Sequence, residues 1–281
     1  MEIYFAILFA GALAAGFLGS LTGLGGGVVI VPLLTIGLGV DIRYAVGTSL
    51  VAVIATSSGA AAAYVREGIT NFRIGMFLET ATTLGAIGGA ALAAILPSYL
   101  LMILFGTMLL YSAGVSFKNR KEEIPAAGKA GRPESRLVRK LKLNGSYQTP
   151  SEHVSYNVFN LGWGYLMMAL AGVLSGLLGI GSGAFKVIAM DTIMKLPFKV
   201  SSATSNFMIG VTAAASAGVY LSRGYIDPVL SMPVVLGVLL GSLTGAKMLI
   251  KSKTKPLRII FSVVILLLAV EMIYNGITKT M

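Results

Sequence analysis

Residues 16–34 read GFLGSLTGLGGGVVIVPLL, and residues 172–190 read GVLSGLLGIGSGAFKVIAM. A shift of 156 positions aligns the second stretch with the first without a gap, and the same register continues through Gly89 and Gly245. Two matching halves, each opened by a glycine-interrupted apolar segment, are typical of secondary transporters, whose binding sites lie beside the broken segments. The repeat therefore predicts a site between the two halves.

The composition indicates a membrane protein. Hydrophobic residues make up 56% of the 281 residues and charged residues only 12%. An apolar run of about 18 or more residues is long enough to cross roughly 30 Å of hydrocarbon as a helix. Such runs lie near 3–24, 44–65, 74–96, 98–117, 158–180, 200–221, 228–250 and 257–275. We therefore expect an all-α, multi-pass protein of the cytoplasmic membrane.

The first apolar segment of each half is too long for one simple crossing. Residues 3–37 would extend about 52 Å as a continuous helix, but Gly23–Gly27 and Pro32 interrupt them. In one layout the segment crosses once, each half has four spans, and the repeats are parallel. In the other it is a hairpin that turns back at mid-membrane, each half has three further spans, and the repeats are inverted.

The basic residues favour the inverted layout. With the termini outside, that layout puts 18 of the 22 basic residues inside, only Arg43, Arg223 and Lys279 outside, and Lys186 in the membrane. The parallel layout instead exports the basic cluster at 251–258, against the positive-inside rule. The predicted fold is thus two inverted structural repeats, each with a glycine-broken re-entrant hairpin plus three transmembrane helices.

A hydrophilic segment joins the halves. We expect a transmembrane repeat over 1–117, a basic cytoplasmic linker over 118–156 and a second transmembrane repeat over 157–281. The linker is rich in charge, Pro, Gly and Ser, which predicts a flexible segment with a short amphipathic helix around 134–143. The net charge of +11 is explained by topology and anionic lipid head groups, not by nucleic acid.

The glycine breaks are the predicted substrate site. Backbone leaves helical geometry at membrane depth only where protein or a water-filled cavity satisfies it. A short helix is expected to begin after each break, near Val28 and Ala184, and helix N-termini bind anions. The candidate backbone positions are Gly25, Gly26, Gly27, Gly181, Ser182 and Gly183. The alternative is that these glycines only permit close helix packing, as expected for 85–89 and 241–245.

Lys186 is the most specific side chain of the predicted site. It lies just past Gly183, where the first half has Ile30. A lysine at this depth needs a partner or an aqueous cavity. It is expected to attract the anion, to form a structural pair with Asp191, or to extend along the hairpin toward water.

Other polar side chains line the helix that follows each break. Their hydroxyl and amide groups could bind sulfonate or carboxylate oxygens, or bond to backbone carbonyls of their own helix. They are Thr48, Ser49, Thr204, Ser205 and Asn206. Glu79 is the candidate for proton coupling because transport of protons within a span needs a titratable group; the alternative is an interfacial pair with Arg73.

The chain resembles the TauE/SafE family of sulfite and organosulfonate exporters, also called the toluene-sulfonate uptake permease family. The resemblance rests on GLGGGVVIVPLL at 23–34, AVGTSLVAV at 45–53, GIGSGAFKV at 179–187 and SSATSNFMIG at 201–210. It implies transport of small anions such as sulfite or sulfoacetate, coupled to the proton gradient. Gly26 becomes Ser182 and Pro32 becomes Ile188 in the second copy, which leaves open whether both hairpins bind substrate equally.

The sequence contains no cysteine, and no metal-ligand cluster, carboxylate pair or Ser/His/Asp set stands out in it. We therefore expect no enzyme activity, no cofactor and no metal. The expected partners are a small anion, protons and membrane lipids, without nucleic acid, and the chain is compatible with a homodimer. Rival hypotheses are an uncoupled anion channel, an uptake permease for another small anion, or a membrane anchor that recruits a partner through the basic linker.

Overall fold

The structure is a computed structural model and describes residues 2–22, 26–66, 69–117, 136–148, 153–251 and 254–278. Helices dominate it, as the apolar composition predicts. The first half contains α1 (Glu2–Thr22), α2 (Gly27–Pro32), the π-helix η1 (Leu33–Gly37), α3 (Ile42–Arg66), α4 (Phe72–Ala93) and α5 (Ser98–Phe117). The second half contains α7 (Leu161–Leu178), α8 (Gly183–Ile188), the π-helix η2 (Ala189–Ile193), α9 (Phe198–Ser222), α10 (Pro228–Lys251) and α11 (Thr254–Thr278).

The sequence repeat is also a repeat of elements. The bounds of α2, η1 and α3 lie 156 positions before those of α8, η2 and α9, and α4 and α5 begin 156 positions before α10 and α11. The short helices predicted after each break are confirmed as α2 and α8. The expected interruption at Pro32 is wrong, because α2 passes directly into η1. Since Ile188 leads into η2 in the same way, the π-helical turns do not depend on proline.

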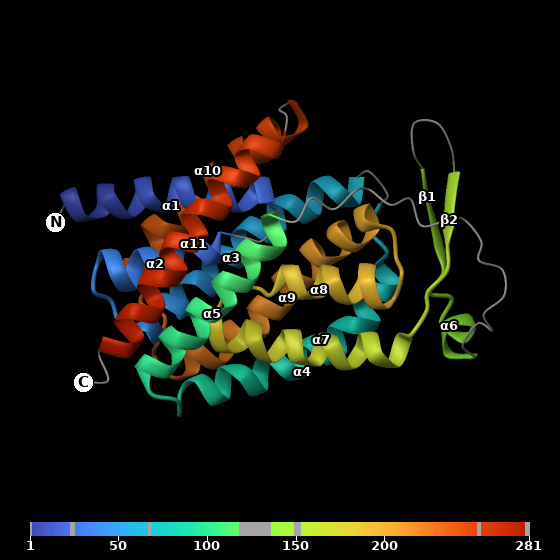
Figure 1. The fold of residues 1–281 in the computed structure, drawn as a ribbon, viewed down its shortest axis with the longest axis horizontal. Coiled ribbons are helices and arrows are strands. Elements are labelled where there is room, and N and C mark those ends of the chain that lie inside the picture. Colours follow the sequence, from blue (N-terminus) through green and yellow to red (C-terminus); the bar gives the residue numbers. More distant parts are fainter. Residues whose placement is uncertain are drawn as a thin grey trace.

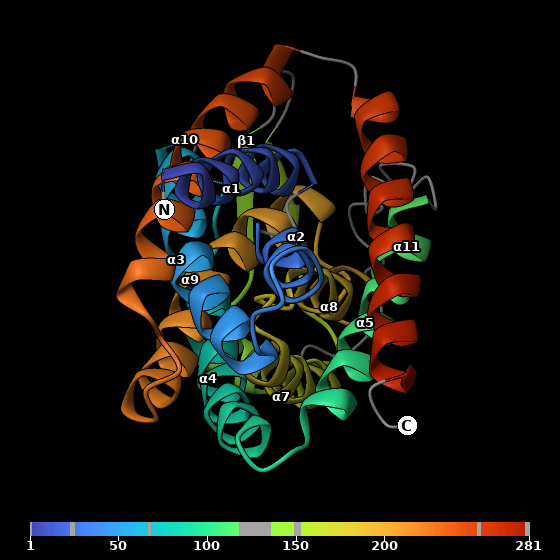
Figure 2. The ribbon, with the colours of Figure 1, turned by 90° about the vertical axis from the view of Figure 1, so that its left-hand side faces the viewer.

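The two halves interlock. The first helix of each half packs along the fourth α-helix of the other, α1 on α10 and α7 on α4, while α3 pairs with α9 and α5 with α11. Figure 2 shows α2 and α8 in the centre with the longer helices around them. In Figure 1, α1 begins at the end where both termini lie, and α7 begins at the opposite end, beside the β-strands.

Glycine allows the interlocking helices to approach closely. A Cβ atom on Gly85 of α4 would lie 2.2 Å from the carbonyl oxygen of Ala169 on α7. Under the repeat, Gly241 of α10 is equivalent, and its Cβ would lie 2.1 Å from the carbonyl oxygen of Leu13 on α1. Real side chains cannot occupy such positions, so these glycines confirm the packing faces predicted from the sequence.

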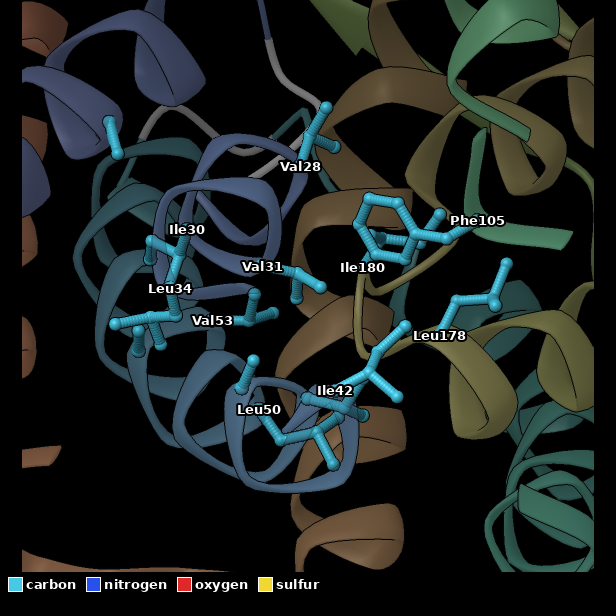
Figure 3. Close-up of a cluster of buried hydrophobic side chains, with 14 of the residues drawn as sticks. Val28, Ile30, Val31, Leu34, Ile42, Leu50, Val53, Phe105, Leu178 and Ile180 are labelled. Atoms are coloured by element: carbon cyan, nitrogen blue, oxygen red, sulfur yellow. The ribbon is translucent and has the colours of Figure 1, made fainter. Parts of the chain in front are cut away.

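The core surrounds the first short helix. Apolar side chains from α2, η1, α3, α5 and the end of α7 converge on one cluster. Figure 3 labels Val28, Ile30, Val31, Leu34, Ile42, Leu50, Val53, Phe105, Leu178 and Ile180. Because α2 is apolar nearly all round, it can only lie inside the protein or within lipid.

Three described stretches are long and apolar enough to cross a membrane, judged by length and composition alone. They are Phe72–Ala93, Leu161–Leu178 and Pro228–Gly245. Shorter apolar helical stretches accompany them at Phe5–Gly19, Gly27–Gly37, Ile42–Ser58, Ser98–Gly114 and Ser262–Thr278.

The linker corrects two expectations. Its described part holds α6 (Arg136–Lys140), within the range predicted for a short helix, but also β1 (Gly145–Gln148) and β2 (His153–Tyr156), which pair antiparallel. The fold is therefore not entirely α-helical, and this part of the linker is not a flexible chain. Residues 118–135 lie outside the described residues.

Asn71 attaches this strand pair to the helices. Its side chain accepts the Ile74 backbone N–H as the N-cap of α4, and its amide nitrogen donates to the Tyr156 hydroxyl at 2.8 Å and to the Leu143 carbonyl at 3.1 Å. Burial raises the pKa of Tyr156 above its usual value, with the Asn71 hydrogen bond acting in the opposite direction. The hydroxyl therefore stays neutral, and this contact persists, across the physiological pH range.

Candidate functional site

The two breaks meet in the centre of the molecule. A Cβ atom on Gly27, at the start of α2, would lie 2.8 Å from the carbonyl oxygen of Gly179, which follows α7. Ser49 of α3 donates a hydrogen bond to the same carbonyl at 2.8 Å. The beginning of the first short helix thus rests against the break of the second half. Gly25, the remaining candidate in the first break, lies outside the described residues.

The backbone of the second break is left-handed. Gly179 and Gly181 have φ of 67° and 68°, and Ser182 has φ of 46°. Only glycine adopts this region freely, so a serine there is held by its surroundings. Gly26, the counterpart of Ser182, has an ordinary right-handed φ of −66°. At this position the two breaks therefore differ in conformation as well as in sequence.

Ser182 presents an unpartnered polar atom at this break. The residue is 2% exposed, and its Oγ has no hydrogen-bond partner within the described part of the chain. Its carbonyl oxygen accepts the backbone N–H groups of Phe185 and Lys186, which begins the turn of α8. A buried hydroxyl without a partner is unfavourable, and one at a functional break is a candidate for contact with a ligand.

Lys186 and Glu79, predicted separately, belong to one cluster. Lys186 is fully buried, and its ammonium donates to Thr212 Oγ1 on α9. Thr212 Oγ1 donates in turn to Glu79 Oε1 on α4 at 2.7 Å, and Thr83 Oγ1 donates to the same oxygen at 3.1 Å. The ammonium is thus directed toward Glu79 through Thr212. The interfacial alternative for Glu79 is not supported, because Glu79 is 5% exposed and Arg73 donates to the Lys142 carbonyl instead.

Thr212 was missed by the sequence analysis. A signal for it existed, since the repeat matches it with Thr56 in the other half, so both halves carry a threonine at the same place in equivalent helices. Threonine in a membrane helix commonly bonds to its own backbone, and Thr212 does so with the Met208 carbonyl at 2.8 Å. Its contacts with Lys186 and Glu79 depend on packing between helices that the sequence does not reveal.

The remaining polar candidates bond to protein groups. Ser205 Oγ donates to the Gly183 carbonyl at 3.3 Å, beside the second break. Thr48 Oγ1 lies 3.3 Å from Ser231 Oγ on α10. Two further side chains form hydrogen bonds with backbone groups. Thr204 Oγ1 accepts the backbone N–H of Asn71 at 3.1 Å, and Asn206 Nδ2 donates to the Ser202 carbonyl at 3.1 Å. Asn206 thus makes the bond within its own helix that the sequence analysis names as the alternative.

Comparison with known proteins agrees with this architecture. The family model described as Sulfite exporter TauE/SafE matches residues 8–272 of the chain. The chain belongs to the TauE/SafE family. The resemblance deduced from the two glycine breaks is therefore confirmed, and the protein is a multi-pass membrane transporter of that family.

Relatives in the TauE/SafE family match between half and nearly all of the chain. The probable membrane transporter protein YunE of Bacillus subtilis (strain 168) is 29% identical over 281 residues, which span 97% of this chain and 98% of that protein. The probable membrane transporter protein YdhB of the same strain is 28% identical, over 86% of this chain and 87% of that protein. Sulfite exporter TauE/SafE family protein 5 of Arabidopsis thaliana is 30% identical over 48% of this chain and 32% of that protein. No solved structure matches the chain significantly.

Proposed function

We propose that this TauE/SafE family transporter is a secondary carrier that exports small sulfur-containing anions, such as sulfite or organosulfonates. The observation that carries the proposal is the fully buried ammonium of Lys186, directly behind a break in the helices. A cation at this depth is unfavourable unless a counter-charge or an aqueous cavity accompanies it, and such residues mark ion and substrate pathways. The family match supports an anionic substrate.

We propose that the halves are inverted repeats whose breaks are re-entrant hairpins. The support is geometric: the element bounds repeat at 156 positions, and α1 and α7 begin at opposite ends of the molecule (Figure 1). The breaks meet between the halves, as expected when two inverted repeats share a site at mid-membrane. Transport then proceeds by movement of one half against the other around this site.

The proposed anion site lies at the second break. Ser182 Oγ has no hydrogen-bond partner within the described ranges, and Lys186 lies one turn further along α8. A sulfite or sulfonate group has three oxygens, which suits an ammonium, a hydroxyl and the N–H groups at the start of a short helix. In the first half, Gly26 and Gly27 are the proposed counterparts.

The remaining candidate residues are proposed to support the anion site rather than to contact the anion first. They are Gly25, Gly181, Gly183, Thr48, Ser49, Thr204, Ser205 and Asn206. Ser49 and Ser205 act by holding carbonyls of the second break, because both donate to them.

A counterflow assay tests the proposal. Purified protein is reconstituted into liposomes loaded with unlabelled sulfite or sulfoacetate, and uptake of the labelled anion is followed. A carrier accumulates label transiently because internal anion accelerates the return of the site; a channel shows no such stimulation. Absence of any anion-dependent uptake, with inorganic anions tested alongside, would contradict the proposal. Export is tested by comparing sulfite efflux from loaded cells with and without the protein.

A further inference from the structure

The charged cluster at the centre joins three helices from the two halves. Lys186 lies on α8, Thr212 on α9 and Glu79 on α4. The Lys186 ammonium donates to Thr212 Oγ1, which donates to Glu79 Oε1 at 2.7 Å. Lys186 and Thr212 are fully buried and Glu79 nearly so. A cation and an anion therefore share one hydroxyl in the buried interior.

The fold does not need these charges. Under the repeat of 156 positions, the counterparts of Lys186, Thr212 and Glu79 in the other half are Ile30, Thr56 and Val235. Ile30 is fully buried, so an apolar side chain fills the equivalent place in the same kind of short helix. Replacing a buried ion pair by apolar residues is often neutral or stabilising. The charges at the second break therefore call for a reason other than packing.

The cluster can take up a proton while the Thr212 hydroxyl keeps an acceptor. Glu79 Oε2 is buried and has no hydrogen-bond partner among the described residues, which leaves that oxygen free to accept the proton. Thr212 has one hydroxyl proton and two acceptors, Glu79 Oε1 at 2.7 Å and the Met208 carbonyl at 2.8 Å. When Glu79 is ionised the hydroxyl points to the carboxylate, and when Glu79 is neutral it can turn to Met208.

We propose that Glu79 balances the Lys186 ammonium while the carrier is empty, and that the transported anion replaces it when Glu79 takes up a proton. This inference rests on the proposed anion carrier and deepens it. If an anion paired with Lys186 while Glu79 stayed ionised, one negative charge would remain buried without a partner, which is strongly unfavourable. A proton from water on Glu79 Oε2 removes that charge. Anion and proton therefore enter the site together and leave together, and Thr212 is a positioning residue between them.

Other ionisable groups lie on the elements around the cluster. They are Arg73 on α4, Tyr165 on α7, Asp191 on η2, and Lys199 and Tyr220 on α9. Tyr165 shares a hydrogen bond with Thr80, and Tyr220 donates to the Gly176 carbonyl, so both hydroxyls have partners outside the cluster. Glu79 is the carboxylate in electrostatic contact with Lys186.

Thermal unfolding of the purified full-length protein tests the pairing without any need for transport. Lys186→Met and Glu79→Gln each strand one buried charge, so each should lower Tm by on the order of 10 °C. The double variant strands none and should recover most of that loss. Thr80→Val, next to Glu79 on α4, should stay close to the wild type. A double variant as unstable as the two losses combined would overturn the inference.

Transport in liposomes tests the exchange itself. The probe is labelled methanesulfonate, which stays a monoanion between pH 6 and 8, with a pH-sensitive dye inside the liposomes. Wild-type uptake should bring protons in with the anion. Glu79→Gln, which needs no proton, should transport without acidification and with a KM lower by about fivefold or more, and Thr212→Val should weaken the link between the two fluxes.

Unchanged acidification and KM in Glu79→Gln would overturn the inference. If the wild type does not carry methanesulfonate, the proposed substrate fails instead, and the unfolding series still decides whether Lys186 and Glu79 balance each other.

Discussion

At the scale of single residues, two serines at equivalent positions hold the second break by unequal hydrogen bonds. Ser49 reaches from the first half to the Gly179 carbonyl of the second at 2.8 Å, whereas its repeat counterpart Ser205 donates to Gly183 of its own half at 3.3 Å. Both serines are buried. The serine at 49 thus forms a hydrogen bond between the two halves, whereas the equivalent serine at 205 forms one within its own half.

This inequality predicts different effects of Ser49→Ala and Ser205→Ala. Removing the Ser49 hydroxyl should lower the free energy of unfolding by about 1–2 kcal/mol, because a buried carbonyl loses a short bond. Ser205→Ala should have a smaller effect, because its bond is longer and weaker. Thermal unfolding of the two variants in the same detergent measures the difference. Equal losses of stability would show that the bond between the halves stabilises the protein no more than the bond within one half.

Gly181 is the second residue with a sharp prediction. Its φ of 68° strains any side chain by about 1–2 kcal/mol, and a Cβ there would lie 2.8 Å from Cγ2 of Ile209. We expect Gly181→Val to be expressed in the membrane but to lose anion transport, because the break can no longer adopt its turn. Gly218→Val on α9, where a Cβ meets nothing within 4 Å, is the control. Normal transport by Gly181→Val would mean that this turn is not part of the route.

At the scale of elements, the crossing of α4 and α7 depends on backbone contact. The equivalent crossing of α1 and α10 is built in the same way, so the interlocking of the halves rests on two copies of one glycine contact. Without room for side chains at these points, each pair of helices can approach only as closely as its glycines permit.

Alanine substitutions at two glycines of α4 distinguish the effect of helix–helix contact from the effect of helix propensity. Gly85→Ala should destabilise the protein by about 1–3 kcal/mol, because the new methyl group would meet the Ala169 backbone and push the helices apart. Gly88→Ala, one turn away with nothing within 4 Å of its Cβ, should be neutral or stabilise by up to about 1 kcal/mol. Thermal unfolding compares them, and a loss of equal size in Gly88→Ala would attribute the effect to the helix rather than to its contact.

At the scale of the whole molecule, the ends of the chain and the linker lie at opposite ends of the long axis (Figure 1). Both the start of α1 and the end of α11 are at one end, and β1, β2 and α6 are at the other. If the long axis follows the membrane normal, the termini and the linker face different compartments. From the distribution of Lys and Arg we expect the linker to face the cytoplasm.

Cysteine labelling tests this orientation, and the native chain has no cysteine to interfere. Ser155 on β2 and Thr278 at the end of α11 are both exposed. In intact cells, a membrane-impermeant thiol reagent should label Thr278→Cys and leave Ser155→Cys unlabelled until the cells are opened. Labelling of both from outside would contradict the inverted arrangement.

The amino-acid sequence determined the repeat, the helices and the positions of the breaks. Those features depend on apolar runs and on glycine, which act over a few neighbouring residues, so the bounds of α2 and α8 follow from local pattern. The packing role of the glycines at 85 and 241 was also predictable, because a glycine within an apolar helix usually marks close contact with another helix. The strand pair of the linker was not predictable, since it gains stability by packing Tyr156 against residues of another segment.

Only the tertiary structure decided which polar groups meet. Glu79 and Thr212 are 133 positions apart, and no local spacing relates either of them to Lys186. The tertiary structure likewise decided that Ser49 bridges the halves while Ser205 does not. Periodic patterns fix which residues share one face of one helix, but a buried charge or hydroxyl is satisfied by whichever side chain an adjacent helix brings within hydrogen-bond distance, and that choice is made by packing.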